Sequence, residues 1–190
     1  MSRKVTREFL YPQIGICGLS CRLCPMYHTE GPSKCQGCKS EFRIAAGCPF
    51  ITCAVKKKGI EFCWDCNESA ECEKWRKHRD FSQKVDSFKC YQKLEEDIIF
   101  IRENGVKEFE KEQLYREQLL KEMLNEFNEG RSKSYYCIAA TVLETDELQE
   151  ALKKAKEISS SLTIKEKSKL LHSIIDEIVK QKKYYLKLRK

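Results

Sequence analysis

The sequence contains 190 residues, with 36 Lys and Arg against 29 Asp and Glu and a formal net charge of +7. This length allows one domain, or a small module followed by a modest second domain. The mean hydropathy is −0.59, and no apolar stretch of about 18 residues is present, so a transmembrane helix is excluded. The N-terminal segment MSRKVTREFLYPQIG lacks the apolar run of roughly 7 to 15 residues found in secretory signals. We therefore expect a cytoplasmic protein.

The cysteines divide the chain into two parts. Ten of the twelve lie between Cys17 and Cys72, and residues 81–190 contain only Cys90 and Cys137, which we interpret as core thiols. The two parts must be stabilised by different interactions. We predict a Cys-rich metal-binding module at residues 1–80 and a helical domain at residues 81–190.

Close cysteine pairs in a reducing compartment are typical of a metal site. A secreted disulfide scaffold is disfavoured because no signal peptide is present and the second half is rich in lysine. Four pairs supply eight ligands, the number that two tetrahedral zinc sites require. These pairs are Cys21 and Cys24, Cys35 and Cys38, Cys48 and Cys53, and Cys63 and Cys66. Cys17 and Cys72 bracket them, and could be a pair that supports the ligands from outside, core thiols, or ligands that displace some of the eight.

The metal and the pairing of the ligands stay open. We favour zinc, about two ions per chain, and sequential pairing, with the first four paired cysteines on one ion and the last four on the other, because this closes the shortest loops. The alternative is an iron–sulfur cluster protein that acts in electron transfer or redox sensing. Cys17-x3-Cys21-x2-Cys24 has the spacing of radical S-adenosylmethionine enzymes, and proline follows Cys24 and Cys48. The remaining chain is too short and too helical for the barrel of those enzymes.

The runs ICGLSCRLCPMY, CQGCKS and GCPFITCAVKKKGIEFCWDC, followed by Cys72, resemble an uncharacterised cysteine-rich family of bacterial and archaeal proteins. That family is catalogued as domain of unknown function 3795. The resemblance covers roughly Cys17 to Glu73. Its members commonly have a proline before the last cysteine, where this chain has Ala70 and Glu71. The resemblance implies a zinc module and supplies no reaction.

The second half shows helical periodicity, which predicts an all-α domain of four to five helices. One helix follows Thr145 as its N-cap and runs through Leu148 to Ile158. The next begins at Thr163, with Glu166 completing a capping box, and continues toward Tyr185. Further helices are predicted at 107–128, ended by Gly130, and at 83–102, ended by Asn104 and Gly105. The segment 135–143 is apolar on all sides and should form the buried centre. Within the module we expect loops or short hairpins.

The remaining features indicate binding rather than catalysis. No Ser-His-Asp order, phosphate loop or metal-activating histidine pair is present, so we expect a non-catalytic interaction or regulatory module, with a protein partner on the helical half. The run Lys56 to Lys58 near Phe50, Phe62 and Trp64 could bind nucleic acid. We prefer a solvated lysine run with packed aromatics, because two zinc sites of four thiolates each would lower the net charge to about +3.

Three smaller features have two interpretations each. His28 could be a nitrogen ligand or a solvated loop residue. The segment from Gly130 to Cys137 could hold an anion at a helix N-terminus or act only as a connector. The basic tail from Lys180 could meet RNA or an anionic surface, but we prefer to interpret it as the cationic end of the last helix.

Overall fold

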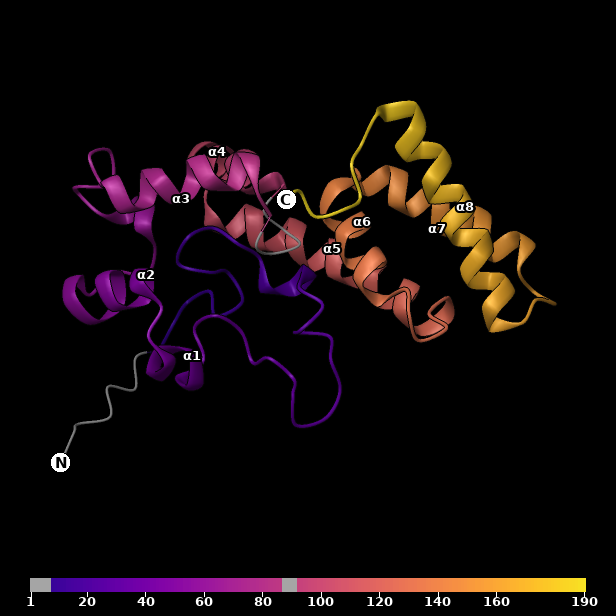
Figure 1. Ribbon diagram of the computed structural model, residues 1–190, viewed down its shortest axis with the longest axis horizontal. Helices are drawn as coiled ribbons and strands as arrows, with labels where there is room; N and C mark the ends of the chain where they lie inside the picture. Colours follow the sequence, from indigo (N-terminus) through magenta and orange to yellow (C-terminus); the bar gives the residue numbers. More distant parts are fainter. Residues whose placement is uncertain (1–7, 87–91) are drawn as a thin grey trace.

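The computed structural model describes residues 8–86 and 92–190, and these residues are largely helical (Figure 1). They contain eight α-helices and no strand beyond an isolated antiparallel bridge between Ile14 and Ser20. None of these helices is long and apolar enough to span a bilayer. The helices are α1 (Glu41–Ala46), α2 (Pro49–Ile51), α3 (Glu73–Lys84), α4 (Leu94–Asn104), α5 (Val106–Glu126), α6 (Lys133–Val142), α7 (Thr145–Ile158) and α8 (Ile164–Lys182).

The helix count is higher than the sequence predicted. Residues beyond 80 contain α4 to α8, and the additional helices α1, α2 and α3 lie in or extend from the Cys-rich segment, where loops or short hairpins were expected. α2 continues directly into a π-helix at Thr52–Lys58. Gly59 then adopts a left-handed conformation, with φ 65°, that ends this helix. The turn glycines therefore act as helix terminators as well as loop formers.

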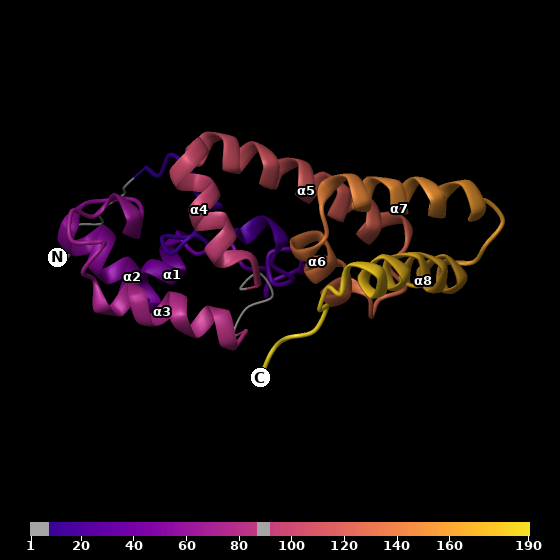
Figure 2. The ribbon, with the colours of Figure 1, turned by 90° about the horizontal axis from the view of Figure 1, so that it is seen from above.

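Helix α5 contacts elements from both parts of the chain. It packs against α4, α6 and α7, and also against a 3₁₀ turn at Cys21–Leu23 from the Cys-rich segment. Figure 2 shows α5 extending from the Cys-rich end toward the hairpin of α7 and α8. Leu23 lies in the same apolar cluster as Leu120 and Met123 of α5. The two parts of the sequence thus share one core.

Helix α6 forms the centre of this core, as predicted. Every residue from Tyr136 to Val142 is buried. The Tyr136 hydroxyl donates to the carbonyl of Phe127, which satisfies the one polar group on its ring. Cys137 is buried in the same cluster, as predicted, whereas Cys90 lies outside the described residues.

The last two helices form a hairpin whose caps were partly predicted. Thr163 and Glu166 form the expected capping box of α8. The N-cap of α7 is Glu144 rather than Thr145, because the Glu144 carboxylate pairs with the backbone at Glu147 in a second capping box. α8 ends at Lys182 and does not reach Tyr185, because Lys183 adopts a left-handed conformation.

The continuous helix predicted at 83–102 is wrong. α3 ends at Lys84 and α4 begins at Leu94, although the end at Asn104 and Gly105 is confirmed. The physical reason is a long-range contact. The Arg189 guanidinium donates to the carbonyls of Ser82 and Gln83 in the last turn of α3, and it also pairs with the buried Asp86 carboxylate at 2.6 Å. The basic tail is therefore docked on α3.

The proposed boundary after residue 80 falls inside α3, and the division into two domains stays a prediction. Contacts across it are close. Gly18, with φ 101°, lies where an added Cβ would approach Leu94 Cδ1 to 3.1 Å and Ile98 Cγ1 to 3.2 Å. Only glycine allows the Cys-rich segment to lie this near α4.

Replacing Leu120, which is fully buried in α5, with alanine should destabilise the protein by about 2–5 kcal/mol, because it removes core contacts and leaves a cavity. Leu114→Ala on the same helix is the matched control, since Leu114 is 40% exposed, and should cost less than about 1 kcal/mol. Urea denaturation measures both. Equal losses would contradict the assignment of Leu120 to the shared core.

Candidate metal centre

Two of the Cys-x2-Cys pairs lie on 3₁₀ turns. The Cys24 N–H donates to the Cys21 carbonyl at 3.1 Å, and the Cys66 N–H donates to the Cys63 carbonyl at 3.3 Å. Side chains three residues apart eclipse one another in a 3₁₀ helix. The turns therefore place both thiols of a pair on one face.

The first four paired cysteines lie together. The Cys38 N–H donates to Cys21 Sγ at 3.2 Å, and the Cys24 thiol interacts electrostatically with Cys35 and Cys38. Gly37, with φ 102°, makes the turn between Cys35 and Cys38. These contacts connect the four residues expected on one ion, and their binding of an ion stays a prediction.

A second group of thiols surrounds Cys63. Burial, together with the nearby thiols of Cys17, Cys72, Cys53 and Cys66, raises the pKa of Cys63. Cys53, Cys63, Cys66 and Cys72 also line one cavity of about 280 Å³. The sequence analysis did not place Cys72 in this group, because spacing along the chain does not show which thiols lie together in the fold.

Cys48 does not line this cavity. It packs against an apolar cluster of Ile16, Ile51 and Ala54, which Cys63 also contacts. Cys17 interacts electrostatically with Cys38 and Cys48, and burial raises its pKa to about 12. Cys17 therefore lies between the two groups of thiols.

Several groups around the cysteine sulfurs can donate hydrogen bonds that would stabilise thiolates. The described cysteines form no disulfides. The backbone amides of Met26 and Tyr27 hydrogen bond to the Cys24 sulfur, and the Lys58 Nζ lies 3.2 Å from Cys66 Sγ. Amide and ammonium donors stabilise a metal-bound thiolate. Among the residues described, no three or more His, Cys, Asp or Glu side chains are already arranged as a metal site.

A buried ion pair beside the thiols was not predicted. The Lys39 side chain is 1% exposed, and its Nζ donates to Glu61 Oε1 at 2.7 Å and to the Tyr11 carbonyl at 2.9 Å. It also lies 3.9 Å from the centre of the Phe62 ring. Burial lowers the pKa of Lys39 to about 8, although Glu61 opposes the change. No sequence signal separates this lysine from the many exposed ones.

The aromatic residues near the lysine run are used in packing, as we preferred. Phe62 is buried and stacks on Trp64 at 4.4 Å between ring centres, while Phe50 contacts His78. Lys56 and Lys57 are exposed, whereas the Lys58 ammonium contacts Cys66 and Glu68.

The two other polar candidates are engaged within the protein. The His28 Nε2 lies 2.5 Å from the Arg22 carbonyl, so this nitrogen has a partner. At the start of α6, the Ser132 hydroxyl donates to Glu129 at 2.6 Å and contacts Ser168 and His172. The Ser132 hydroxyl is therefore part of an internal network.

Comparison with family models identifies the Cys-rich segment. Residues 13–77 match the family described as Protein of unknown function (DUF3795). The resemblance seen in the cysteine pattern is thereby confirmed over this segment. The curated proteins and the solved structures give no match to the chain. The DUF3795 segment contains both groups of thiols and the Lys39–Glu61 pair.

Replacing Glu61 with glutamine should destabilise the protein by about 3 kcal/mol or more, because it leaves the buried Lys39 ammonium without its counter-charge. The double variant Lys39→Met with Glu61→Gln should recover much of that loss, since it removes both charges. Chemical denaturation of the two single variants and the double variant gives the coupling free energy. Additive losses would show that the two side chains are not coupled.

Proposed function

We propose that the DUF3795 segment binds two metal ions through cysteine thiolates, with zinc preferred, and that metal binding stabilises its fold. The observation that carries this proposal is the separation of the thiols into two groups within one short segment. Thiolates in fours are typical ligands of structural zinc. Binding would require the thiols of each group to turn toward a common ion.

The proposed ligands of the first ion are Cys21, Cys24, Cys35 and Cys38. For the second ion we propose Cys53, Cys63, Cys66 and Cys72, because these four line a single cavity. This replaces Cys48 of the sequential scheme with Cys72. Cys17 and Cys48 then remain outside both sets.

The proposed role is non-catalytic. A zinc ion held by four protein thiolates keeps no open position for water or substrate, which catalysis requires. When bound, zinc would supply folding free energy to a segment with a small apolar core. In this state the Lys58 ammonium, which also pairs with Glu68 at 2.7 Å, would offset part of the negative charge on Cys66.

A protein partner for the helical half stays a prediction. Exposed apolar side chains are present on α4 and α5, with Ile99 at 51% and Tyr115 at 38% exposure. Scattered exposed apolar residues are common on proteins and do not define an interface. The proposed function therefore concerns the metal sites alone.

Elemental analysis of the full chain, purified without added metal, should find about two zinc ions per molecule in a colourless sample. A brown sample with visible absorption and bound iron would support the iron–sulfur alternative instead. Removing the metal with a chelator should lower the melting temperature. A fully folded chain without any bound metal would contradict the proposal.

Single cysteine variants should separate the two ions. Cys35→Ser and Cys63→Ser should each lose about one zinc ion, because each removes one ligand of a different group. Cys137→Ala is the control, since Cys137 lies in the helical core, and it should retain both ions. Native mass spectrometry counts the ions on folded molecules only. Loss of both ions from either serine variant would contradict two separate sites.

Cys72→Ser and Cys48→Ser distinguish the two ligand sets for the second ion. Only Cys72 lines the cavity with Cys53, Cys63 and Cys66. Cys72→Ser should therefore reduce the zinc content by about one ion, and Cys48→Ser should leave it unchanged. The opposite result would restore the sequential set.

A further inference from the structure

A separate polar cavity lies where the DUF3795 segment meets the helical half. Its volume is about 250 Å³, room for several water molecules at roughly 30 Å³ each. Ser20 and Leu23 line it from the Cys-rich side, while α4, α5 and α6 supply the other walls. It shares no lining residue with the thiol cavity around Cys63.

Two buried acceptors in its wall have no partner among the described residues. Gln113 is 3% exposed and Ser20 is 1% exposed, yet Gln113 Oε1 and Ser20 Oγ make no hydrogen bond. A buried polar atom without a partner costs about 1–3 kcal/mol. Both atoms therefore mark a place where a donor is expected.

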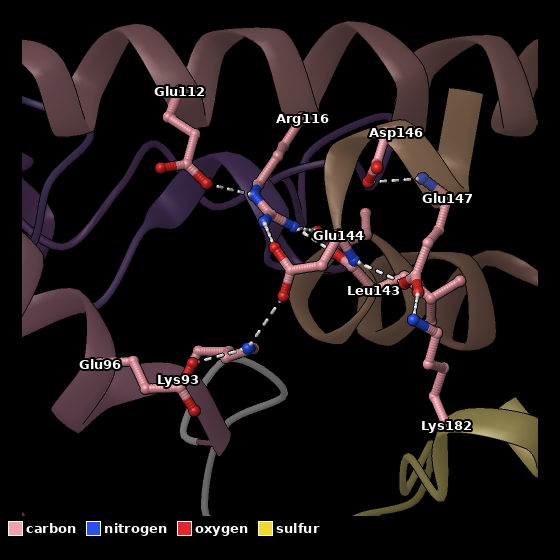
Figure 3. Close-up of polar contacts among 10 residues, drawn as sticks. Lys93, Glu96, Glu112, Arg116, Leu143, Glu144, Asp146, Glu147 and Lys182 are labelled. Atoms are coloured by element: carbon pink, nitrogen blue, oxygen red, sulfur yellow. Dashed lines mark hydrogen bonds and ion pairs between the residues drawn. The ribbon is translucent and has the colours of Figure 1, made fainter. Parts of the chain in front are cut away.

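The positive groups of the wall are already engaged, as Figure 3 shows. The Arg116 guanidinium donates to Glu112 at 2.9 Å and to the carbonyls of Ala140 and Leu143 at 3.1 and 2.6 Å. The Lys93 Nζ contacts Glu96 at 2.6 Å and Glu144 at 3.5 Å. Neither cation is left to receive an anionic ligand.

The negative groups of the wall are in excess. Four carboxyl groups line the cavity against two cations. Asp97 has neither a hydrogen bond nor an ion pair within the part of the chain that the structure describes. Burial raises the pKa of this carboxyl, and Glu112 and Glu96 raise it further, while Arg116 and Lys93 act in the opposite direction. The Asp97 side chain is only half-buried, and a cation placed beside it would favour the ionised carboxylate over the protonated acid.

We propose that this cavity binds a small organic cation with a primary ammonium group. The ammonium carries three donors and no acceptor, which matches the Asp97 carboxylate, Gln113 Oε1 and Ser20 Oγ. Leu23 and Phe100, which also line the cavity, would contact a short aliphatic stem. The volume exceeds that of a single metal ion, which favours an organic ligand.

The probe is n-butylammonium, added to the full-length protein at its natural metal content and followed by isothermal titration calorimetry and by NMR. An alkylammonium is protonated at pH 7. The probe should bind, while n-butanol and butyrate, which match its stem but lack the ammonium, should not. Magnesium chloride tests for an inorganic cation. Binding of magnesium without n-butylammonium, or no binding of any probe, would overturn the proposal.

Asp97→Asn should weaken binding by about tenfold or more, because it removes the charged acceptor. Glu103→Gln is the matched control, since it removes one exposed carboxylate from the same helix, and it should bind as the parent chain does. Unchanged affinity in Asp97→Asn, or an equal loss in both variants, would overturn the proposal.

Ser20→Ala and Gln113→Leu keep the test decisive if Asp97→Asn does not fold. Each removes one unpartnered acceptor and should weaken n-butylammonium binding severalfold. Their own stability should be unchanged or higher without ligand, because an unsatisfied buried group is lost. Retained affinity in both folded variants would overturn the proposed site.

Discussion

The docking of the Cys21–Leu23 turn on α5 is the interaction on which the rest of the arrangement depends. Arg22 lies in this turn, and its guanidinium donates to Glu117 at 2.8 Å and to Glu110 at 3.1 Å. The Glu117 side chain is 5% exposed, so the pair is largely excluded from water. The next residue, Leu23, enters the main core. One short turn therefore presents thiols, a cation and an apolar side chain in different directions.

This docking connects the candidate metal centre with the helical half. Because Cys21 and Cys24 flank Arg22 and Leu23, any change in the turn that gathers the two thiols also changes how the turn contacts α5. The other contacts across the same junction are equally close. Gly18 approaches α4, and Arg189 contacts the last turn of α3, the helix that begins within the Cys-rich segment. The Cys-rich segment is thus held from several sides by elements distant in sequence.

The sequence predicted the features that depend on local chemistry. The capping box at Thr163 and the buried helix α6 were visible because caps and apolar runs act over a few residues. The break between α3 and α4 was not visible, because Arg189 lies more than a hundred residues from Ser82. The sequence also suggested loops between cysteine pairs, since glycine predicts a turn but does not say whether a short helix precedes it.

For the candidate metal site too, the sequence indicated what depends on residues close in the chain and not what depends on distant ones. Pair spacing predicted a shared ion for Cys21, Cys24, Cys35 and Cys38, and the structure shows individual contacts among these thiols. It did not place Cys72 beside Cys63, because the intervening residues carry no pattern that fixes their path. The Lys39–Glu61 pair and the polar cavity at Ser20 were invisible, since each combines groups from separate segments.

The buried ion pairs at these junctions affect the orientation of the Cys-rich segment more than they affect the free energy of unfolding. Moving a charge out of water costs free energy that a single ion pair only partly returns, so Arg22–Glu117 and Lys39–Glu61 add little net stability. A misplaced turn, however, would leave each of these charges buried without its partner, at a cost of several kcal/mol. The ion pairs therefore disfavour alternative placements of the Cys-rich segment. Apolar contacts hold the segment on the helices, and the buried charges restrict the orientation in which it can pack there.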